Sequence, residues 1–70
     1  MSVEELLKSM DAKELVKRFR IRLIEQDISI KNFTEKNGLN YQYFVQAIND
    51  TINMKEEYRT LIEKFLQETD

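Results

Sequence analysis

Residues 29–48 read SIKNFTEKNGLNYQYFVQAI, and this stretch decides the fold. Ser29 is a favourable N-cap, because its hydroxyl can accept a hydrogen bond from a backbone N–H, and it predicts a helix over residues 30–36. The pair Asn37-Gly38 ends this helix, since glycine adopts the left-handed conformation at no steric cost. A short helix therefore stops at a tight turn.

A second short helix follows this turn. Asn40 is again a good N-cap and predicts a helix that begins at residue 41 and extends to 48 or 49. Two short helices around a glycine turn make a helix-turn-helix, in which a small residue is needed where the helices cross. Thr34 is that residue, and Leu39 fills the core from the turn. The side chains expected to face inward from the two helices are Ile30, Phe33, Phe44, Ala47 and Ile48.

The flanking segments predict three more helices. The first spans residues 3–9 and has Ser2 as its N-cap. The second spans residues 11–26. The last spans residues 54–68 and follows a loop of poor helix formers at residues 49–53.

Apolar residues at helical spacing give these three helices their buried faces. Ile21 and Ile24 fall outside the apolar stripe of their helix, so we expect the first helix to cover them. Asn53 and Glu56 resemble a capping box at the start of the last helix. The residues expected in the core are Val3, Leu6, Leu7, Met10, Ala12, Leu15, Val16, Phe19, Leu23, Met54, Tyr58, Leu61, Ile62, Phe65 and Leu66.

The composition indicates one small helical domain. A chain of 70 residues allows a single domain, residues 1–70, and a hydrophobic share of 41% is enough for one core. Proline is absent and Gly38 is the only glycine, which favours helices joined by tight turns. Short helices are not stable alone, so they must share one core. The predicted fold is an all-α domain of five helices with its helix-turn-helix at residues 29–48.

The residue types present argue against catalysis, cofactors and metals. The chain has no histidine and no cysteine, so the commonest general base, a thiol nucleophile and most transition-metal sites are missing. A single glycine excludes a phosphate-cradling glycine loop, and the 13 acidic residues are scattered among lysines. We expect a protein that is not an enzyme and has no catalytic residue, cofactor or metal.

The chain start and the apolar runs bear on localisation. The stretch MSVEELLKSMD has early acids and no apolar run, so it does not predict a signal peptide. No segment approaches the roughly 18 apolar residues of a membrane span. We therefore expect a soluble cytoplasmic protein that does not contact a membrane.

Positive charge is concentrated in one segment although the net charge is −2. Residues 15–24 hold Lys17, Arg18, Arg20 and Arg22 and no acid. A local basic patch can face DNA while the rest of the molecule is negative. The alternative is an ordinary solvated helix face, with Arg18 paired to the acid four residues before it.

The outward positions of the helix at 41–48 have the chemistry of base reading. In a major groove, the N-terminal part of such a helix reaches base edges. Glutamine can bond adenine through N6 and N7, and valine can touch a thymine methyl group. The expected base contacts are Tyr41, Gln42, Val45 and Gln46.

The turn region resembles a known family. Its pattern is an apolar residue, a small residue, glycine, another apolar residue and a polar helix opener, here Phe33, Thr34, Gly38, Leu39 and Asn40. In this pattern the chain resembles the lambda repressor and Cro family, also called XRE-like, over about residues 12–66. The resemblance implies a lambda-repressor-like fold and a transcriptional regulator of phage or mobile-element type that binds double-stranded DNA.

The resemblance also implies contacts with the DNA backbone. It places Asn40 and the start of the preceding helix, near Lys31, against phosphates, and a helix N-terminus favours a phosphate electrostatically. Lys36, Thr51 and Asn53 are weaker phosphate candidates.

The last helix raises the question of a homodimer, because a palindromic operator needs two-fold symmetry. Phe65 and Leu66 are the candidates for a contact between two copies. The alternative is that the same apolar stripe simply closes the core of the monomer.

A protein-binding role is the competing hypothesis. The same scaffold can hold a protein partner, as an antirepressor or another phage-encoded inhibitor would, without binding DNA. Three features favour it: the pI near 5.1, the aromatic pair Tyr41 and Tyr43, and Asp50, where the family usually has glycine. The two hypotheses differ in salt dependence, since binding through phosphates weakens steeply as salt rises.

Overall fold

The computed structural model describes residues 3–69, with side chains from residue 5 onward. This part of the chain has five α-helices, one short 3-10 helix and no strand, which confirms the expected all-α class. The expected cap Ser2 and the side chain of Val3 lie outside what is described. The elements are α1 (Val3–Ser9), α2 (Ala12–Glu25), α3 (Ile30–Lys36), α4 (Tyr41–Asn49), the 3-10 helix η1 (Thr51–Asn53) and α5 (Glu56–Glu68).

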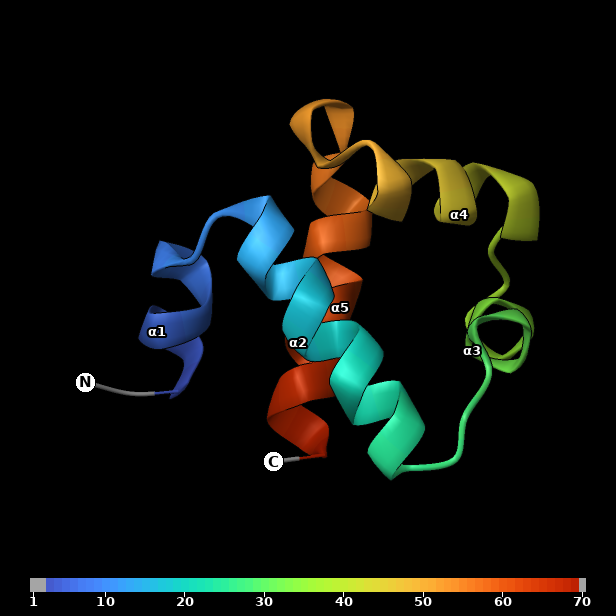
Figure 1. Ribbon diagram of the computed structural model, residues 1–70, viewed down its shortest axis with the longest axis horizontal. Coiled ribbons are helices and arrows are strands. Elements are labelled where there is room, and N and C mark those ends of the chain that lie inside the picture. The colour runs from blue at the N-terminus through green and yellow to red at the C-terminus, as the bar shows by residue number, and fades with distance from the viewer. Residues whose placement is uncertain (1–2, 70) are drawn as a thin grey trace.

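Helices α2 and α5 pack against each other and form the centre of the molecule (Figure 1). Helix α1 packs against α5 on one side of this pair, and α3 and α4 contact each other on the opposite side. The 3-10 helix η1 follows α4 and contacts α2. The two helices of the expected helix-turn-helix, α3 and α4, therefore lie on the side of the α2–α5 pair that faces away from α1.

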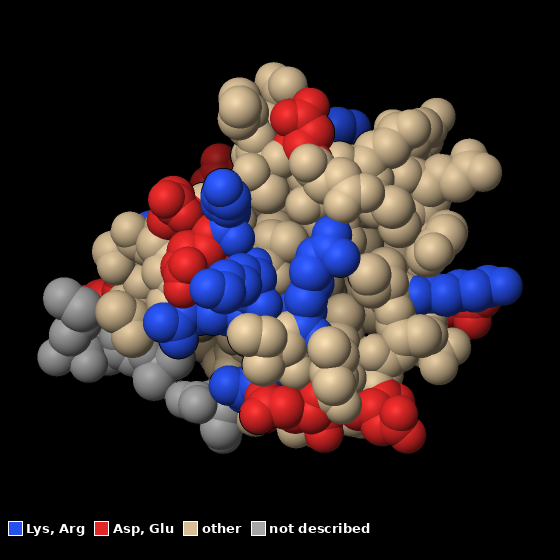
Figure 2. Space-filling view, in the orientation of Figure 1, with Lys and Arg blue, Asp and Glu red and all other residues tan. Residues whose placement is uncertain are grey.

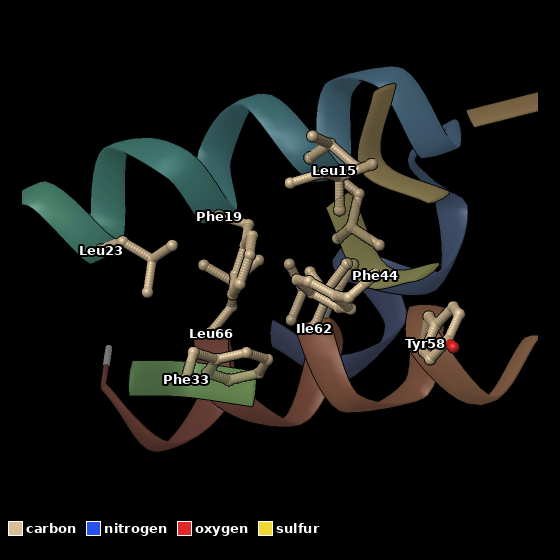
Figure 3. Close-up of a cluster of buried hydrophobic side chains, with 11 residues drawn as sticks. Leu15, Phe19, Leu23, Phe33, Phe44, Tyr58, Ile62 and Leu66 are labelled. Carbon is tan, nitrogen blue, oxygen red and sulfur yellow. The ribbon is translucent and has the colours of Figure 1, made fainter. Parts of the chain in front are cut away.

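The core is built around the ring of Phe19, which is fully buried. Its centroid lies 5.0 Å from that of Phe33 and 5.8 Å from that of Phe44, both edge to face (Figure 3). Phe65 adds a third edge-to-face ring at 5.5 Å. Each such pair contributes about 0.5–1.5 kcal/mol beyond the burial of apolar area. One aromatic cluster thus joins α2, α3, α4 and α5.

Most of the expected core residues are indeed inside. Met10, Ile30, Ala47, Met54 and Phe65 are partly buried and pack against the core. Ala12 and Leu61 are also only partly buried. The fully buried apolar residues are Leu7, Leu15, Val16, Phe19, Leu23, Phe33, Phe44, Ile48, Tyr58, Ile62 and Leu66.

Three apolar residues contradict the predicted burial. Leu6 is 47% exposed, Ile21 is 49% exposed and Ile24 is 78% exposed. The prediction that α1 covers both isoleucines is wrong, because α1 packs against α5. Only Ile21 borders α1, across a shallow groove that it shares with Leu6 and Leu7.

The ends of α2 carry signals that the sequence analysis missed. Asp11 is the N-cap, and its carboxylate accepts a hydrogen bond of 2.9 Å from the backbone N–H of Glu14. At the other end, Asp27 takes the left-handed conformation with φ +56°. The N–H of Ile28 donates to the carbonyl of Leu23 at 2.9 Å, which is the long bond of a Schellman motif. Because aspartate tolerates positive φ less well than glycine, its identity did not mark this turn.

Helix α5 begins at Glu56, so the predicted start at residue 54 is wrong. Its N-cap position is Lys55, which makes no side-chain capping bond. The expected capping box is also wrong, because the Asn53 amide donates to the Asp50 carboxylate at 3.1 Å. The physical reason is that η1 ends in an extended residue, Met54, which separates it from α5.

Arg59 of α5 attaches α1 to the rest of the molecule. Its Nη2 donates to the carbonyl oxygens of Leu7 at 3.4 Å and Lys8 at 3.3 Å, and also to that of Met10. These carbonyls lie at or just after the end of α1, where backbone acceptors lack helical partners. The same guanidinium lies 3.7 Å from Glu63, a carboxylate that is only 9% exposed. Arg59 thus holds a helix end and forms an ion pair with a nearly buried acid, whose Oε1 has no hydrogen-bond partner among the described residues.

Candidate nucleic-acid interface

The turn between α3 and α4 has the geometry that the sequence predicts. Gly38 has φ +67°, and its N–H donates to the carbonyl of Glu35 at 3.3 Å. The N–H of Leu39 donates to the carbonyl of Thr34 at 2.8 Å, which completes a Schellman motif. A Cβ built on Gly38 would meet no atom within 4 Å, so glycine is needed here for its backbone angle alone.

Both helices of the pair begin with the expected caps. The Ser29 hydroxyl accepts from the backbone N–H of Asn32 at 3.0 Å, and Asn40 Oδ1 accepts from that of Tyr43 at 3.1 Å. Thr34 is completely buried, as expected for the small residue at the crossing of α3 and α4. These local features define two capped short helices joined by a tight turn at Gly38.

Helix α4 has one inner and one outer face. Phe44 is fully buried and Ile48 is 3% exposed, so both side chains anchor the helix in the core. Gln42 and Gln46 are both exposed, one turn apart on the outer face. Asn49 continues the same stripe, at positions i, i+4 and i+7. The outer face of α4 is therefore a row of amides.

The other expected base contacts border this row. Tyr41 is 46% exposed and Tyr43 is 64% exposed, while Val45 is half-buried. Helix α4 has no charged residue over its whole length. Its surface can therefore offer hydrogen bonds and aromatic or methyl contacts, and it offers no charge of its own.

The two expected phosphate lysines on α3 lie in different places. Lys31 and Lys36 are both exposed, but five positions correspond to about 140° around a helix. Lys36 borders a groove of about 290 Å³ that it shares with Leu61 and Lys64 of α5. The structure therefore does not bring Lys31 and Lys36 together on one face.

The polar phosphate candidates around α4 are partly engaged. Asn40 uses its side-chain oxygen in the cap, which leaves its NH₂ group as a donor. Asn53 donates to the carboxylate of Asp50, and Thr51 is half-buried in η1. The amide donor of Asn53 is therefore already bonded to the carboxylate of Asp50, whose negative charge would repel a phosphate at this position.

The basic residues of α2 divide into two sets. Arg18 pairs with Glu14 at 3.3 Å, as in the alternative of a solvated helix face, and Arg22 pairs with Glu25 at 3.3 Å. Arg20 instead reaches α4, where its Nη2 donates to Asn49 Oδ1 at 2.8 Å. Figure 2 shows blue side chains gathered over α2, beside a tan surface over α4. The contact between Arg20 and α4 was not predicted. The sequence does show that Lys13, Lys17 and Arg20 stand at positions i, i+4 and i+7 and so share one face of α2, but it does not show what that face contacts.

The expected dimer contacts belong to the core of the monomer. Leu66 is 4% exposed, so the prediction that it faces a second copy is wrong. Phe65 is partly buried, and its ring contacts Phe19 at 5.5 Å and Phe33 at 5.3 Å. Both side chains are held inward because α5 packs its apolar stripe against α2. The stripe therefore closes the monomer, which is the alternative left open above.

Comparison of the chain with protein-family models, with curated proteins and with solved structures gives no match. Among residues 3–69, no helix is both long enough and apolar enough to cross a bilayer. The same residues contain no group of three or more side chains of the metal-binding types histidine, cysteine, aspartate and glutamate placed to hold an ion.

Proposed function

We propose that this chain is a sequence-specific DNA-binding transcriptional regulator of the lambda repressor and Cro type. The observation that carries the proposal is the outer face of α4, where Gln42 and Gln46 are exposed on a helix that follows the Gly38 turn. Short helices joined in this way present the second helix to a major groove. The side chains of this face make no core contact and are open to solvent, and without Lys or Arg they would read adenine and thymine rather than guanine.

Each side chain on this face has a role in the proposal. Gln42 and Gln46 bond adenine through N6 and N7, and Val45 packs against a thymine methyl group. Tyr41, at the first position of α4, contacts a base or a phosphate. Asn40, Lys31, Lys36, Thr51 and Asn53 are the phosphate contacts of the proposal.

The proposed regulation is repression by occupancy of a promoter. A dimer bound to a palindromic operator would place two copies of α4 about 34–36 Å apart in successive major grooves. The family resemblance extends this proposal to a phage or mobile-element regulator that acts in the cytoplasm.

Selection of bound fragments from random duplex DNA tests the proposal. We expect an enriched motif with adenines at the positions that Gln42 and Gln46 read. Two copies of that motif, spaced by one helical turn, would support the dimer. The Q42A/Q46A variant provides the matched control, because it keeps the fold and removes both readers. Selection that enriches no motif with the folded parent protein would contradict the proposal.

A second candidate function is binding to a protein partner. It is favoured by the exposed pair Tyr41 and Tyr43, since tyrosine is enriched in protein interfaces, and by exposed acids at both ends of the helix-turn-helix, Asp27 and Asp50. An antirepressor or a similar inhibitor would use this face. A titration distinguishes the two: DNA binding must weaken steeply with salt, whereas a contact made by tyrosines changes far less.

A further inference from the structure

Helix α2 carries a row of cations on one side. Lys13, Lys17 and Arg20 stand at positions i, i+4 and i+7, which share one face of a helix. The row is about 10 Å long, because each residue adds 1.5 Å along the axis. Phosphates on one DNA strand follow each other every 3.4 Å along the duplex axis. The row therefore spans about three phosphate-to-phosphate steps along one strand.

These cations line a groove between α2 and the end of α4. The groove has a volume of about 780 Å³, and its apolar floor includes Val16 and Ile48. Asn49 and Thr51, which end α4 and begin η1, add polar groups to the far wall. A phosphodiester backbone, with its charged phosphates and polar sugars, can lie in such a groove with hydrogen-bond donors from α2 on one side and from the end of α4 and η1 on the other.

The acids that line the same groove are already engaged. The carboxylate of Asp11 caps α2 through the N–H of Glu14, and the carboxylate of Glu14 pairs with Arg18 at 3.3 Å. Lys13 and Lys17 form no ion pair or hydrogen bond within residues 3–69. The positive charge of the row is therefore available to an anion.

Arg20 joins the groove to the amide row of α4. Its Nη2 donates to Asn49 Oδ1 at 2.8 Å, and Asn49 lies one turn beyond Gln46 on the same face. A guanidinium has five N–H donors, so this bond leaves others for a phosphate. The surface that would read bases thus continues into a surface that would hold a backbone.

We propose that this groove binds the phosphodiester backbone of DNA next to the bases that α4 reads. The inference rests on the proposed function and names its main charged contacts, Lys13, Lys17 and Arg20; the sequence had indicated Lys17 and Arg20 only as part of a basic segment, and Lys13 and the groove beside α4 come from the structure. Other parts of the helix-turn-helix are less suited to this task, because Lys31 and Lys36 diverge on α3 and Asp50 follows α4.

The test uses non-specific binding, because that binding depends on phosphates and needs no known operator. Fluorescence anisotropy with a random-sequence duplex of roughly 20 base pairs, followed from about 25 to 200 mM salt, gives the slope of log K against log salt. The variant K13Q/K17Q removes two charges from the groove. The matched control, K8Q/K64Q, removes two charges from the opposite α1–α5 surface, and thermal unfolding monitors the fold of both.

We expect K13Q/K17Q to lower the magnitude of the slope by about two, one unit for each lost phosphate contact, and the control to lower it by much less than one. Equal slopes for K13Q/K17Q and the control, with a parent that binds steeply, would overturn the groove alone. A folded parent that binds no duplex at low salt would overturn both the groove and the proposed function.

Discussion

Helices α2 and α4 each bury one phenylalanine completely, Phe19 and Phe44, and the two rings meet edge to face at 5.8 Å. Their outer faces have little in common. Helix α2 presents lysines and arginines, whereas α4 presents amides and tyrosines and no charge. Backbone contacts position a protein on DNA and base contacts give it specificity. In the proposed function, α2 would therefore supply affinity and α4 selectivity, while the inner faces of both helices pack in the same core.

The inner faces give the largest expected effect. Phe19→Ala and Phe44→Ala should each cost about 3–5 kcal/mol, since each removes a fully buried ring from the aromatic cluster. A domain of this size has roughly 3–5 kcal/mol from its core, so both variants should be largely unfolded. Circular dichroism with urea denaturation measures this. A variant that stays folded at one position alone would show that the two inner faces are not equivalent.

The outer face of α4 comes next. Gln42→Ala or Gln46→Ala should weaken binding to a selected operator by about 1–3 kcal/mol, as for one lost bidentate base contact. Unfolding midpoints should not change, because both side chains are exposed. Gln67→Ala on α5 is the matched control. If Gln42→Ala and Gln46→Ala bind the operator as tightly as Gln67→Ala does, then α4 does not read bases and the proposed division of roles between α2 and α4 is wrong.

The hinge between α3 and α4 has an effect of similar or smaller size. Gly38→Ala should destabilise the domain by about 1–2 kcal/mol, because alanine is strained at φ +67°. Space does not contribute, since a Cβ meets nothing within 4 Å. Gly38→Asn should cost less, because asparagine tolerates this conformation. Equal losses for the two variants in urea titrations would point to a cause other than backbone strain.

The helix caps give the smallest expected effect and compare α2 with α4 directly. Asp11→Ala and Asn40→Ala should each cost about 1 kcal/mol, because each removes the side chain that accepts a hydrogen bond from the first turn. Asn40→Asp keeps the acceptor and should retain most of the stability. Chemical denaturation at one fixed salt concentration compares the three. A loss with Asn40→Asp as large as that with Asn40→Ala would argue against the cap.

The features that the sequence predicts correctly are local ones. Ser29, Gly38 and Asn40 act on partners within four residues, so residue type and position are sufficient to predict them. The 3.6-residue period likewise predicts which side of α4 is buried and which carries Gln42 and Gln46. The same reasoning fails at Asp27, because a non-glycine residue holds the left-handed turn after α2.

Contacts between distant segments were beyond such reasoning. The hydrogen bond between Arg20 and Asn49 spans 29 positions, and it is the contact that joins the cation row to the amide row. The prediction that α1 covers Ile21 and Ile24 was wrong for the same reason, because α1 packs against α5, which is distant in sequence. For the candidate site, the exposed outer face of α4 was therefore predictable and the groove beside it was not.

The guanidinium of Arg59 links α5 to backbone oxygens 49 to 52 positions earlier in the chain. Because α1 packs against α5, which is distant in sequence, we expect this link to form only once α5 is in place. Helix α1 has only seven residues and is not stable alone. Amide hydrogens of α1 should therefore exchange with solvent sooner than those of any other helix, as expected of the last segment to dock and the first to detach.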